Sequence, residues 1–176
     1  AQFAAAWDAA GFKTVGHIVW PKPYASRASH ALYRHESAFI LAKGYPQKPA
    51  NPISDIQPWR YTGNKDHPTQ KSVGIIEPLI ESFSKPGDLV LDPFLGSGTA
   101  AIAAALKGRE YIGIELEPSY CELARQRLAR LHEAGKLQVP IKPEPPAVKS
   151  TRSAEVGSRR ASMLFPSVTD LIAIQP

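Results

Sequence analysis

The chain has 176 residues, 43% of them hydrophobic, and this length and composition indicate one globular domain with room for a tail. Its single cysteine excludes an internal disulfide framework and a zinc site built on several cysteines, and it fits a cytoplasmic protein. No apolar run approaches the roughly 20 residues needed to cross a bilayer, so no membrane association is expected. The formal net charge of +5 fits a protein that binds a polyanion, and equally an ordinary solvated surface.

The first segment, residues 1–44, is expected to fold as helix, strand, loop and strand. Gln2–Ala10 has a helical pattern, and Gly11 follows it as the residue type that commonly ends a helix. Val15–Trp20 is a β-rich run closed by a proline, and Ser37–Ala42 is a second apolar run. The chain has no initial methionine and begins as though inside a helix, so we expect it to start part-way through a larger protein.

The next two segments differ sharply in pattern. Residues 45–71 contain five prolines and few apolar runs, which predicts a long loop of the kind that is more often functional or disordered than filler. Residues 72–136 alternate between helical and strand patterns, which predicts an α/β fold with a parallel sheet and right-handed crossovers. The expected elements are a helix around Ile75–Phe83, a buried strand Leu89–Leu91 ending at Asp92, an Ala-rich helix Thr99–Lys107, a buried strand Tyr111–Ile114 ending at Glu115, and a helix Ser119–Glu133 with an apolar stripe at Leu123, Leu128 and Leu131.

The remaining residues, 137–176, are expected to form a flexible, basic tail rich in proline and serine. From Lys136 onward the chain carries six basic and three acidic residues, a formal charge of +3. A short strand at Asp170–Ile174 is the one regular element expected there. The folded domain is therefore expected to span residues 1–136.

The segment Leu89–Thr99, LVLDPFLGSGT, carries the strongest functional signal. After Asp92, Gly96 and Gly98 let the backbone turn sharply and approach a ligand closely, and the helix start beyond them offers N–H groups to a carboxylate or phosphate. Asp92 would lie at the carboxyl end of its strand, where open α/β sheets bind ligands, and Glu115 would end the next strand, where a carboxylate can bind a ribose diol. Each feature alone fits an ordinary turn or strand end, whereas together they predict a nucleoside site.

Two motifs make a family resemblance specific. Residues 92–99, DPFLGSGT, resemble the cofactor motif DPF-x-GSGT of DNA amino-methyltransferases, whereas dinucleotide-binding Rossmann proteins space their glycines differently. Residues 67–71, HPTQK, resemble the family's HPT-[EQ]-K motif, which opens the helix before the cofactor strand. Their order is that of the β group, in which the catalytic half precedes the cofactor half, and the resemblance covers residues 1–133. It includes Tyr111–Glu115, which is similar to the ribose-binding strand, and HIVW with Lys22.

This resemblance implies a Rossmann-like, parallel-sheet α/β methyltransferase fold that binds S-adenosylmethionine and needs no metal. The implied cofactor-binding residues are Asp92, Phe94, Gly96, Ser97, Gly98 and Thr99 around the methionine end and sugar, Glu115 at the ribose hydroxyls, and His67, Thr69, Gln70 and Lys71 in the HPTQK loop over the methionine carboxylate. Lys71 would give a charge-assisted hydrogen bond, and its alternative is a solvated residue at a helix start. His67 has no acid near it in the sequence, so we interpret it as a residue that shapes the loop.

The family's catalytic motif, [DNS]-PP-[YFW], is missing from the expected place. Its polar residue holds the target amine, and its aromatic ring stacks on the flipped base. The one Pro-Pro pair, Pro145-Pro146, follows Glu144, precedes Ala147 and lacks the aromatic residue. The fold is therefore expected to be incomplete at the N-terminus, with an upstream segment or a partner chain supplying the motif, and no catalytic residue is assigned in this chain.

The function implied by the resemblance is methyl transfer from S-adenosylmethionine to an exocyclic amine of double-stranded DNA, in restriction-modification. Adenine is favoured over cytosine by analogy with β-group members that carry HPTQK. Two alternatives remain open: a non-catalytic remnant that binds the cofactor or DNA, and a methyltransferase of another substrate, against which HPTQK argues.

Several other side chains have two interpretations each. Three aromatic residues could stack on bases, although a core position is the commoner one: Trp20, Trp59 and Tyr61. Three basic residues could contact phosphates, and a solvated surface explains them equally well: Lys22, Arg27 and Arg34.

Overall fold

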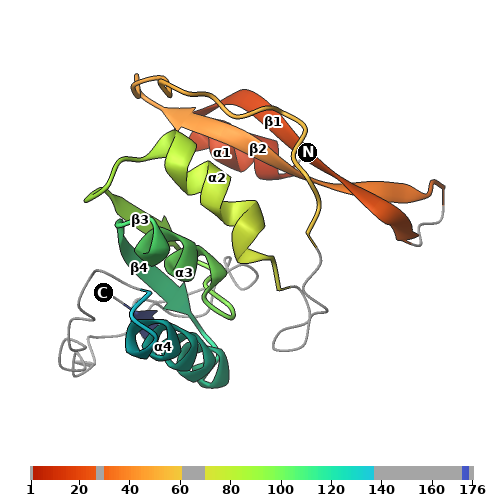
Figure 1. Ribbon diagram of the computed structural model, residues 1–176. Coiled ribbons are helices and arrows are strands. Elements are labelled where there is room, and N and C mark those ends of the chain that lie inside the picture. The colour runs from red at the N-terminus through yellow and green to blue at the C-terminus, as the bar shows by residue number, and fades with distance from the viewer. Residues whose placement is uncertain (1, 27–29, 61–69, 137–171, 175–176) are drawn as a thin grey trace, which may run out of the picture.

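The computed structural model describes residues 2–26, 30–60, 70–136 and 172–174. In chain order the elements are α1 (Gln2–Ala9), β1 (Phe12–Ser26), β2 (Tyr33–Lys43), α2 (Val73–Phe83), β3 (Leu89–Asp92), α3 (Thr99–Leu106), β4 (Glu110–Glu115), α4 (Pro118–Glu133) and β5 (Ile172–Ile174). A ribbon of β1 and β2 lies at one end, the sheet of β3 and β4 lies at the other, and α2 lies between them (Figure 1). No helix in these described ranges is both long and apolar enough to cross a membrane.

The two strands of the ribbon are longer than the sequence predicted. They pair antiparallel, from Phe12 opposite Lys43 to Ser26 opposite Tyr33, and one end of the ribbon projects away from the rest of the molecule (Figure 1). The expectation that the first strand closes at Pro21 is wrong, because β1 continues to Ser26. In a two-stranded ribbon each strand is an edge, so a proline, which lacks an N–H, can be accommodated without breaking a central ladder.

Helix α2 joins the ribbon to the second sheet. Its buried Ile75 packs with Ile18 and Trp20 of β1 in one apolar cluster, and α2 also contacts α3. Part of the proline-rich segment is ordered against the same strand, because the Val19 N–H donates to the Asp55 carbonyl at 2.7 Å. The predicted helical spacing therefore identified α2 correctly, and its apolar face meets the ribbon.

The second sheet has the order β3-β4-β5. Strands β3 and β4 pair in parallel with Asp92 opposite Gly113, so the prediction that Asp92 and Glu115 end neighbouring strands is confirmed. The sheet is not wholly parallel, because β5 pairs antiparallel with β4. This strand lies within the predicted Asp170–Ile174, and the rest of the predicted tail, residues 137–171 and 175–176, lies outside the described residues.

One face of this sheet is covered and the other is open among the described residues. Helices α3 and α4 pack on the face of Val90 and Tyr111, where five consecutive residues of α3, Ala101 to Ala105, are buried. The prediction of a buried strand at Leu89–Leu91 is wrong for two of its three residues, since Leu89 and Leu91 are 56% and 58% exposed. Side chains alternate between faces along a strand, and no described helix covers the face of these leucines. On α4 the buried stripe is Cys121, Ala124 and Leu128, while the predicted Leu123 is only half-buried.

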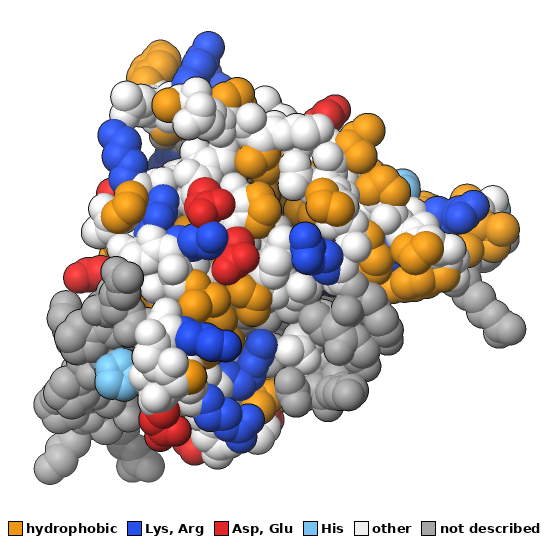
Figure 2. All heavy atoms as spheres, viewed as in Figure 1, with side chains coloured by type: hydrophobic (Ala, Val, Ile, Leu, Met, Phe, Trp, Pro, Cys, Tyr) orange, Lys and Arg blue, Asp and Glu red, His pale blue; other side chains and the backbone are white. Residues whose placement is uncertain are grey.

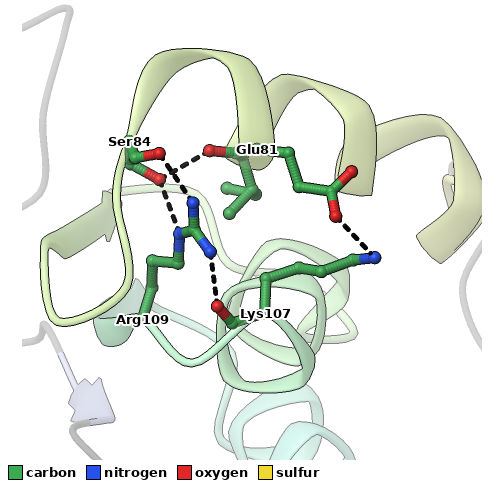
Figure 3. Close-up of polar contacts among 5 residues, drawn as sticks. Glu81, Ser84, Lys107 and Arg109 are labelled. Carbon is green, nitrogen blue, oxygen red and sulfur yellow. Dashed lines mark hydrogen bonds and ion pairs between the residues drawn. The ribbon is translucent and has the colours of Figure 1, made fainter.

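A buried arginine ties α2 to the start of β4 (Figure 3). Arg109 is 6% exposed, and its Nε and Nη2 donate to the hydroxyl and carbonyl of Ser84 at 3.0 and 2.6 Å. Its Nη1 donates to the carbonyl of Lys107, whose own ammonium pairs with Glu81 at 2.9 Å. This cluster lies at the amino end of β4, at the opposite end of the strand from Glu115.

Candidate cofactor site

Two carboxylates lie at the carboxyl ends of the parallel strands β3 and β4. Glu115 Oε2 accepts a hydrogen bond from the Gly96 N–H at 2.7 Å, and its Oε1 accepts from the N–H groups of Leu116 and Glu117 at 2.8 and 3.0 Å. The carboxylate is therefore held by backbone donors from both strand ends. This arrangement fixes the direction of the Glu115 carboxylate.

The carboxyl group of Asp92 lies in a less favourable environment for its charge. Burial raises the pKa of Asp92; the hydrogen bond from the Phe94 N–H at 3.0 Å opposes this, and the nearby charge of Glu115 raises the pKa further. A carboxylate that is desolvated and close to another gains most from ligand groups that donate hydrogen bonds. The pair is therefore suited to hydroxyl or ammonium groups of a ligand.

Close contacts within the protein favour glycine at positions 98 and 113. Gly98 has a φ of +82°, and a Cβ added there would lie 2.8 Å from the Cβ of Ala124 on α4. Gly113 in β4 would bring an added Cβ within 2.6 Å of the Leu95 side chain. Gly96 also has a positive φ, of 52°. The sequence suggested that close approach to a ligand explained the loop glycines, and the structure shows close approach of α4 to Gly98.

The side chains of Ser97 and Thr99 are buried and engaged with other segments of the chain. Arg127 Nη1 of α4 donates to the carbonyl of Ser97 and, at 3.0 Å, to its hydroxyl. The hydroxyl of Thr99 donates to the Lys71 carbonyl at 3.1 Å. Sequence reasoning missed Arg127, although a basic residue beside the buried Ala124 and Leu128 positions of a helix is a signal that could have singled it out.

The contact between Thr99 and Lys71 brings the two sequence motifs together. It joins the end of HPTQK to the start of α3, while the Lys71 side chain is exposed. Gln70 is half-buried, and Phe94 at the loop is 79% exposed. His67 and Thr69 lie outside the described residues.

The aromatic and basic residues of the ribbon separate into core and surface groups. Trp20 is 5% exposed and Trp59 packs against the same cluster, as the core interpretation expected. Lys22 is buried and bonds to Glu36 at 3.1 Å and to Ser26 at 2.6 Å, which leaves it unsuited to a phosphate contact. Arg34 is exposed, and Arg27 and Tyr61 lie outside the described residues. Within the described part of the chain, no group of three or more His, Cys, Asp or Glu residues could hold a metal ion.

Comparison with curated proteins finds relatives that match most of this chain. YubD of Escherichia coli (strain K12) is 52% identical over 133 residues, which cover 76% of this chain and 59% of YubD. The type II methyltransferase M2.MboI of Moraxella bovis is 35% identical over 137 residues, which cover 66% of this chain and 50% of that protein. The chain thus spans between half and three fifths of the length of these relatives.

Comparison with solved structures finds proteins crystallised with S-adenosylmethionine. The M1.HpyAVI–SAM complex superimposes with a TM-score of 0.56 and 31% identity, covering 72% of this chain and 70% of the other. TTHA0409 from Thermus thermophilus, complexed with S-adenosyl-L-methionine, gives a TM-score of 0.55 and 32% identity over 70% of this chain and 56% of its own. The family N6_N4_Mtase, described as DNA methylase, matches residues 1–126. The chain therefore belongs to the N6_N4_Mtase DNA methylase family.

Proposed function

We propose that this chain is the cofactor-binding part of a DNA amino-methyltransferase, which transfers a methyl group from S-adenosylmethionine to an exocyclic amine of double-stranded DNA. The observation that carries the proposal is the meeting of three segments at one edge of the sheet: the glycine loop after β3, Glu115 at the end of β4, and Lys71 at the end of HPTQK. The cofactor complexes of M1.HpyAVI and TTHA0409 support the same ligand for this chain.

The polar groups at this edge match the polar parts of S-adenosylmethionine. The carboxylates of Asp92 and Glu115 would accept hydrogen bonds from its ribose hydroxyls and ammonium group. Helix α3 begins behind Gly98 without a side-chain cap, so its first N–H groups can receive a carboxylate, and Lys71 adds positive charge from the neighbouring segment. Phe94 offers an exposed apolar surface beside the loop. The other residues predicted from the sequence would line or close the same site: Gly96, Ser97, Thr99, His67, Thr69 and Gln70.

The chain's own part in the reaction would be positional. When bound, S-adenosylmethionine supplies a methyl group on a sulfonium, which an amine can displace in line. The held glycine loop and the fixed Glu115 carboxylate would set where that methyl group lies relative to the base. Fixing two reactants in this way can supply about 7–11 kcal/mol of a barrier, provided the target amine is held as well.

A further part of the proposal concerns the missing catalytic motif. A segment that bears [DNS]-PP-[YFW], upstream in the same protein or in a partner chain, would complete the Rossmann-like fold beside β3. Among the described residues β3 pairs with β4 alone, and Leu89 and Leu91 are exposed. Both observations support this, because parallel sheets normally carry helices on both faces. The greater length of the relatives supports it as well.

The ribbon is the part of the chain best suited to the DNA backbone. Residues 12–43 contain five Lys or Arg residues and one acidic residue, a formal charge of +4 out of the chain's +5. The projecting ribbon presents Lys and Arg side chains next to hydrophobic ones (Figure 2), and Tyr33 and Leu32 near its end are 53% and 74% exposed. Basic groups of this kind fix a protein on the phosphates without reading the sequence.

Adenine as the target base, a role in restriction-modification and a cytoplasmic location belong to the same proposal.

A second candidate function is that of a non-catalytic remnant that binds the cofactor or DNA. The 176 residues contain no [DNS]-PP-[YFW] sequence, and this candidate needs none. Both candidates allow cofactor binding, so methyl transfer is the measurement that separates them.

Calorimetry with S-adenosylmethionine tests the site, using the wild type, Asp92→Ala and the exposed control Asp8→Ala. We expect binding by the wild type and the control and a loss of at least about tenfold for Asp92→Ala, which corresponds to about 1.4 kcal/mol. Equal affinities in all three, with binding clearly detected, would place the cofactor elsewhere.

Methyl transfer tests the reaction. The 176-residue chain and the same chain joined to an upstream segment bearing the motif are incubated with tritiated cofactor and mixed-sequence duplex DNA. Transfer is expected only with the joined segment, because loss of even one preorganised donor costs about 10²–10³ in rate. Nucleoside analysis of the product then distinguishes methylated adenine from methylated cytosine. Robust transfer by the 176 residues alone would contradict the proposal, and no transfer by either protein would favour the remnant.

A further inference from the structure

Arg127 reaches from helix α4 into the glycine loop, where neither the sequence motifs nor the expected cofactor contacts gave it a role. Its Nη1 donates to both the carbonyl and the hydroxyl of Ser97, a residue that is only 4% exposed. Arg127 is half-buried and lies next to Leu128, which belongs to the core. A guanidinium in this position bonds to the loop through a charge-assisted donor, which makes a stronger hydrogen bond than a neutral one.

The contact fixes one particular peptide unit, the one between Ser97 and Gly98. The Ser97 carbonyl accepts from Arg127, and the Gly98 N–H at the other side of the same plane donates to the Leu95 carbonyl at 2.9 Å. Because a peptide unit is planar, holding both of its polar groups sets its orientation. Gly98 is the N-cap of α3, so this orientation also sets the direction of the first N–H groups of the helix.

The other anchors of the loop lie on its opposite side, toward the sheet. The Leu95 N–H donates to the Ile114 carbonyl at 2.9 Å, and the Gly96 N–H donates to Glu115 at 2.7 Å. The loop is therefore held between β4 and α4, and Arg127 supplies the side-chain contact from α4. The close approach of Gly98 to Ala124 lies one turn away on the same helix.

We propose that Arg127 is a positioning residue of the cofactor site: it holds the Ser97–Gly98 peptide so that the start of α3 faces the carboxylate of the bound cofactor. This rests on the proposed function, since S-adenosylmethionine is the ligand. Arg127 acts through the loop and touches no reacting atom. A residue that only stabilised the fold would change the melting temperature without changing the affinity of the folded molecules.

The test compares the wild type, Arg127→Ala, Arg127→Lys and Arg130→Ala, the last being an exposed arginine on the same helix. Hydrogen exchange of the loop amides, residues 95–101, is measured without ligand, and affinity for S-adenosylmethionine is measured by calorimetry on protein shown to be folded. We expect faster loop exchange and at least about tenfold weaker binding for Arg127→Ala, since that is the effect of losing one good hydrogen bond to a charged group. Arg127→Lys, which retains the charge and a donor, should recover part of both effects, and Arg130→Ala should change neither.

Unchanged loop exchange in Arg127→Ala, or unchanged affinity in the folded variant, would overturn the proposal. An equal loss in Arg130→Ala would overturn it too, because the effect would then come from the charge of the helix. If the wild type failed to bind S-adenosylmethionine, the proposed function would fail, while the exchange comparison, made without ligand, would still accept or reject the hold of Arg127 on the loop. If Arg127→Ala did not fold, Arg127→Lys against the wild type would decide both measurements.

Discussion

The carboxylate of Glu115 accepts a hydrogen bond from the backbone N–H of Gly96 at 2.7 Å, which joins the end of β4 to the loop that follows β3. Its second oxygen accepts from Leu116 and Glu117. An ionised carboxylate has about four acceptor positions, and backbone N–H groups of the described residues fill three of them. Glu115 therefore has a structural role in addition to the ribose contact proposed for it.

Replacing Glu115 should lower stability as well as cofactor affinity. Glu115→Gln removes the charge and one acceptor oxygen, so we expect it to lower the free energy of unfolding by about 1–3 kcal/mol. Urea denaturation measures this, with Glu133→Gln on the exposed side of α4 as the control. A Glu115→Gln chain as stable as the control would show that the three backbone contacts contribute little.

Replacing Asp92 should have the opposite effect on stability. The folded-state pKa of Asp92 is raised above its usual 3.8, so its ionised form destabilises the fold at neutral pH, and this cost disappears as the pH falls through the folded-state pKa toward 3.8. Asp92→Asn keeps an oxygen for the Phe94 N–H but does not titrate. We expect it to melt at a higher temperature than the wild type at pH 7 and to lose that advantage in acid.

Thermal melts from pH 7 into the acid range test this prediction, with Asp92→Asn, the wild type and the exposed control Asp8→Asn. The control should show no such trend. A lower melting temperature for Asp92→Asn at pH 7 would mean that the carboxylate stabilises the ligand-free loop.

Gly98→Ala should lower the free energy of unfolding more than Gly87→Ala does. Gly98 and Gly87 have φ values of +82° and +87°, so alanine is strained at both, but only at Gly98 does the added Cβ meet another residue, the Cβ of Ala124 at 2.8 Å. We expect Gly98→Ala to lower the unfolding free energy by about 1–3 kcal/mol more than Gly87→Ala, which is the usual cost of overpacking. Ala124→Gly should recover part of this in a double-mutant cycle. Equal losses of unfolding free energy in the two variants would show that backbone strain accounts for the whole effect.

Replacing Arg109 should lower the free energy of unfolding and leave the cofactor affinity unchanged. Arg109→Met leaves the Ser84 and Lys107 carbonyls without their buried donor, so we expect a loss of about 2–4 kcal/mol in unfolding free energy. Lys107→Met breaks only the more exposed pair with Glu81 and should cost about 0.2–1 kcal/mol. Calorimetry on folded Arg109→Met should give an unchanged cofactor affinity, because the cluster lies at the far end of β4. A weakened affinity would mean that strain at this end reaches Glu115.

Sequence patterns alone predicted the order of elements from α2 to α4 and the neighbouring strand ends at Asp92 and Glu115. Apolar periodicity reports which side of a helix or strand is buried, and parallel β-α-β units allow few topologies, so these expectations needed no coordinates. Two short motifs, HPTQK and DPFLGSGT, were enough to predict the family, which the match over residues 1–126 confirms.

The contacts that hold the loop depend on how the elements pack in three dimensions. Three contacts hold it: Arg127 donates to Ser97, Thr99 donates to Lys71, and Ala124 packs against Gly98. The two residues of each pair are about 25 to 30 positions apart in the sequence, and local sequence patterns carry no information about such pairs. The exposure of Leu89 and Leu91 could not be predicted either, because an apolar strand has the same sequence pattern whether one face of its sheet or both are covered. Burial depends on what packs against a residue, and that is set by the arrangement of whole elements in space.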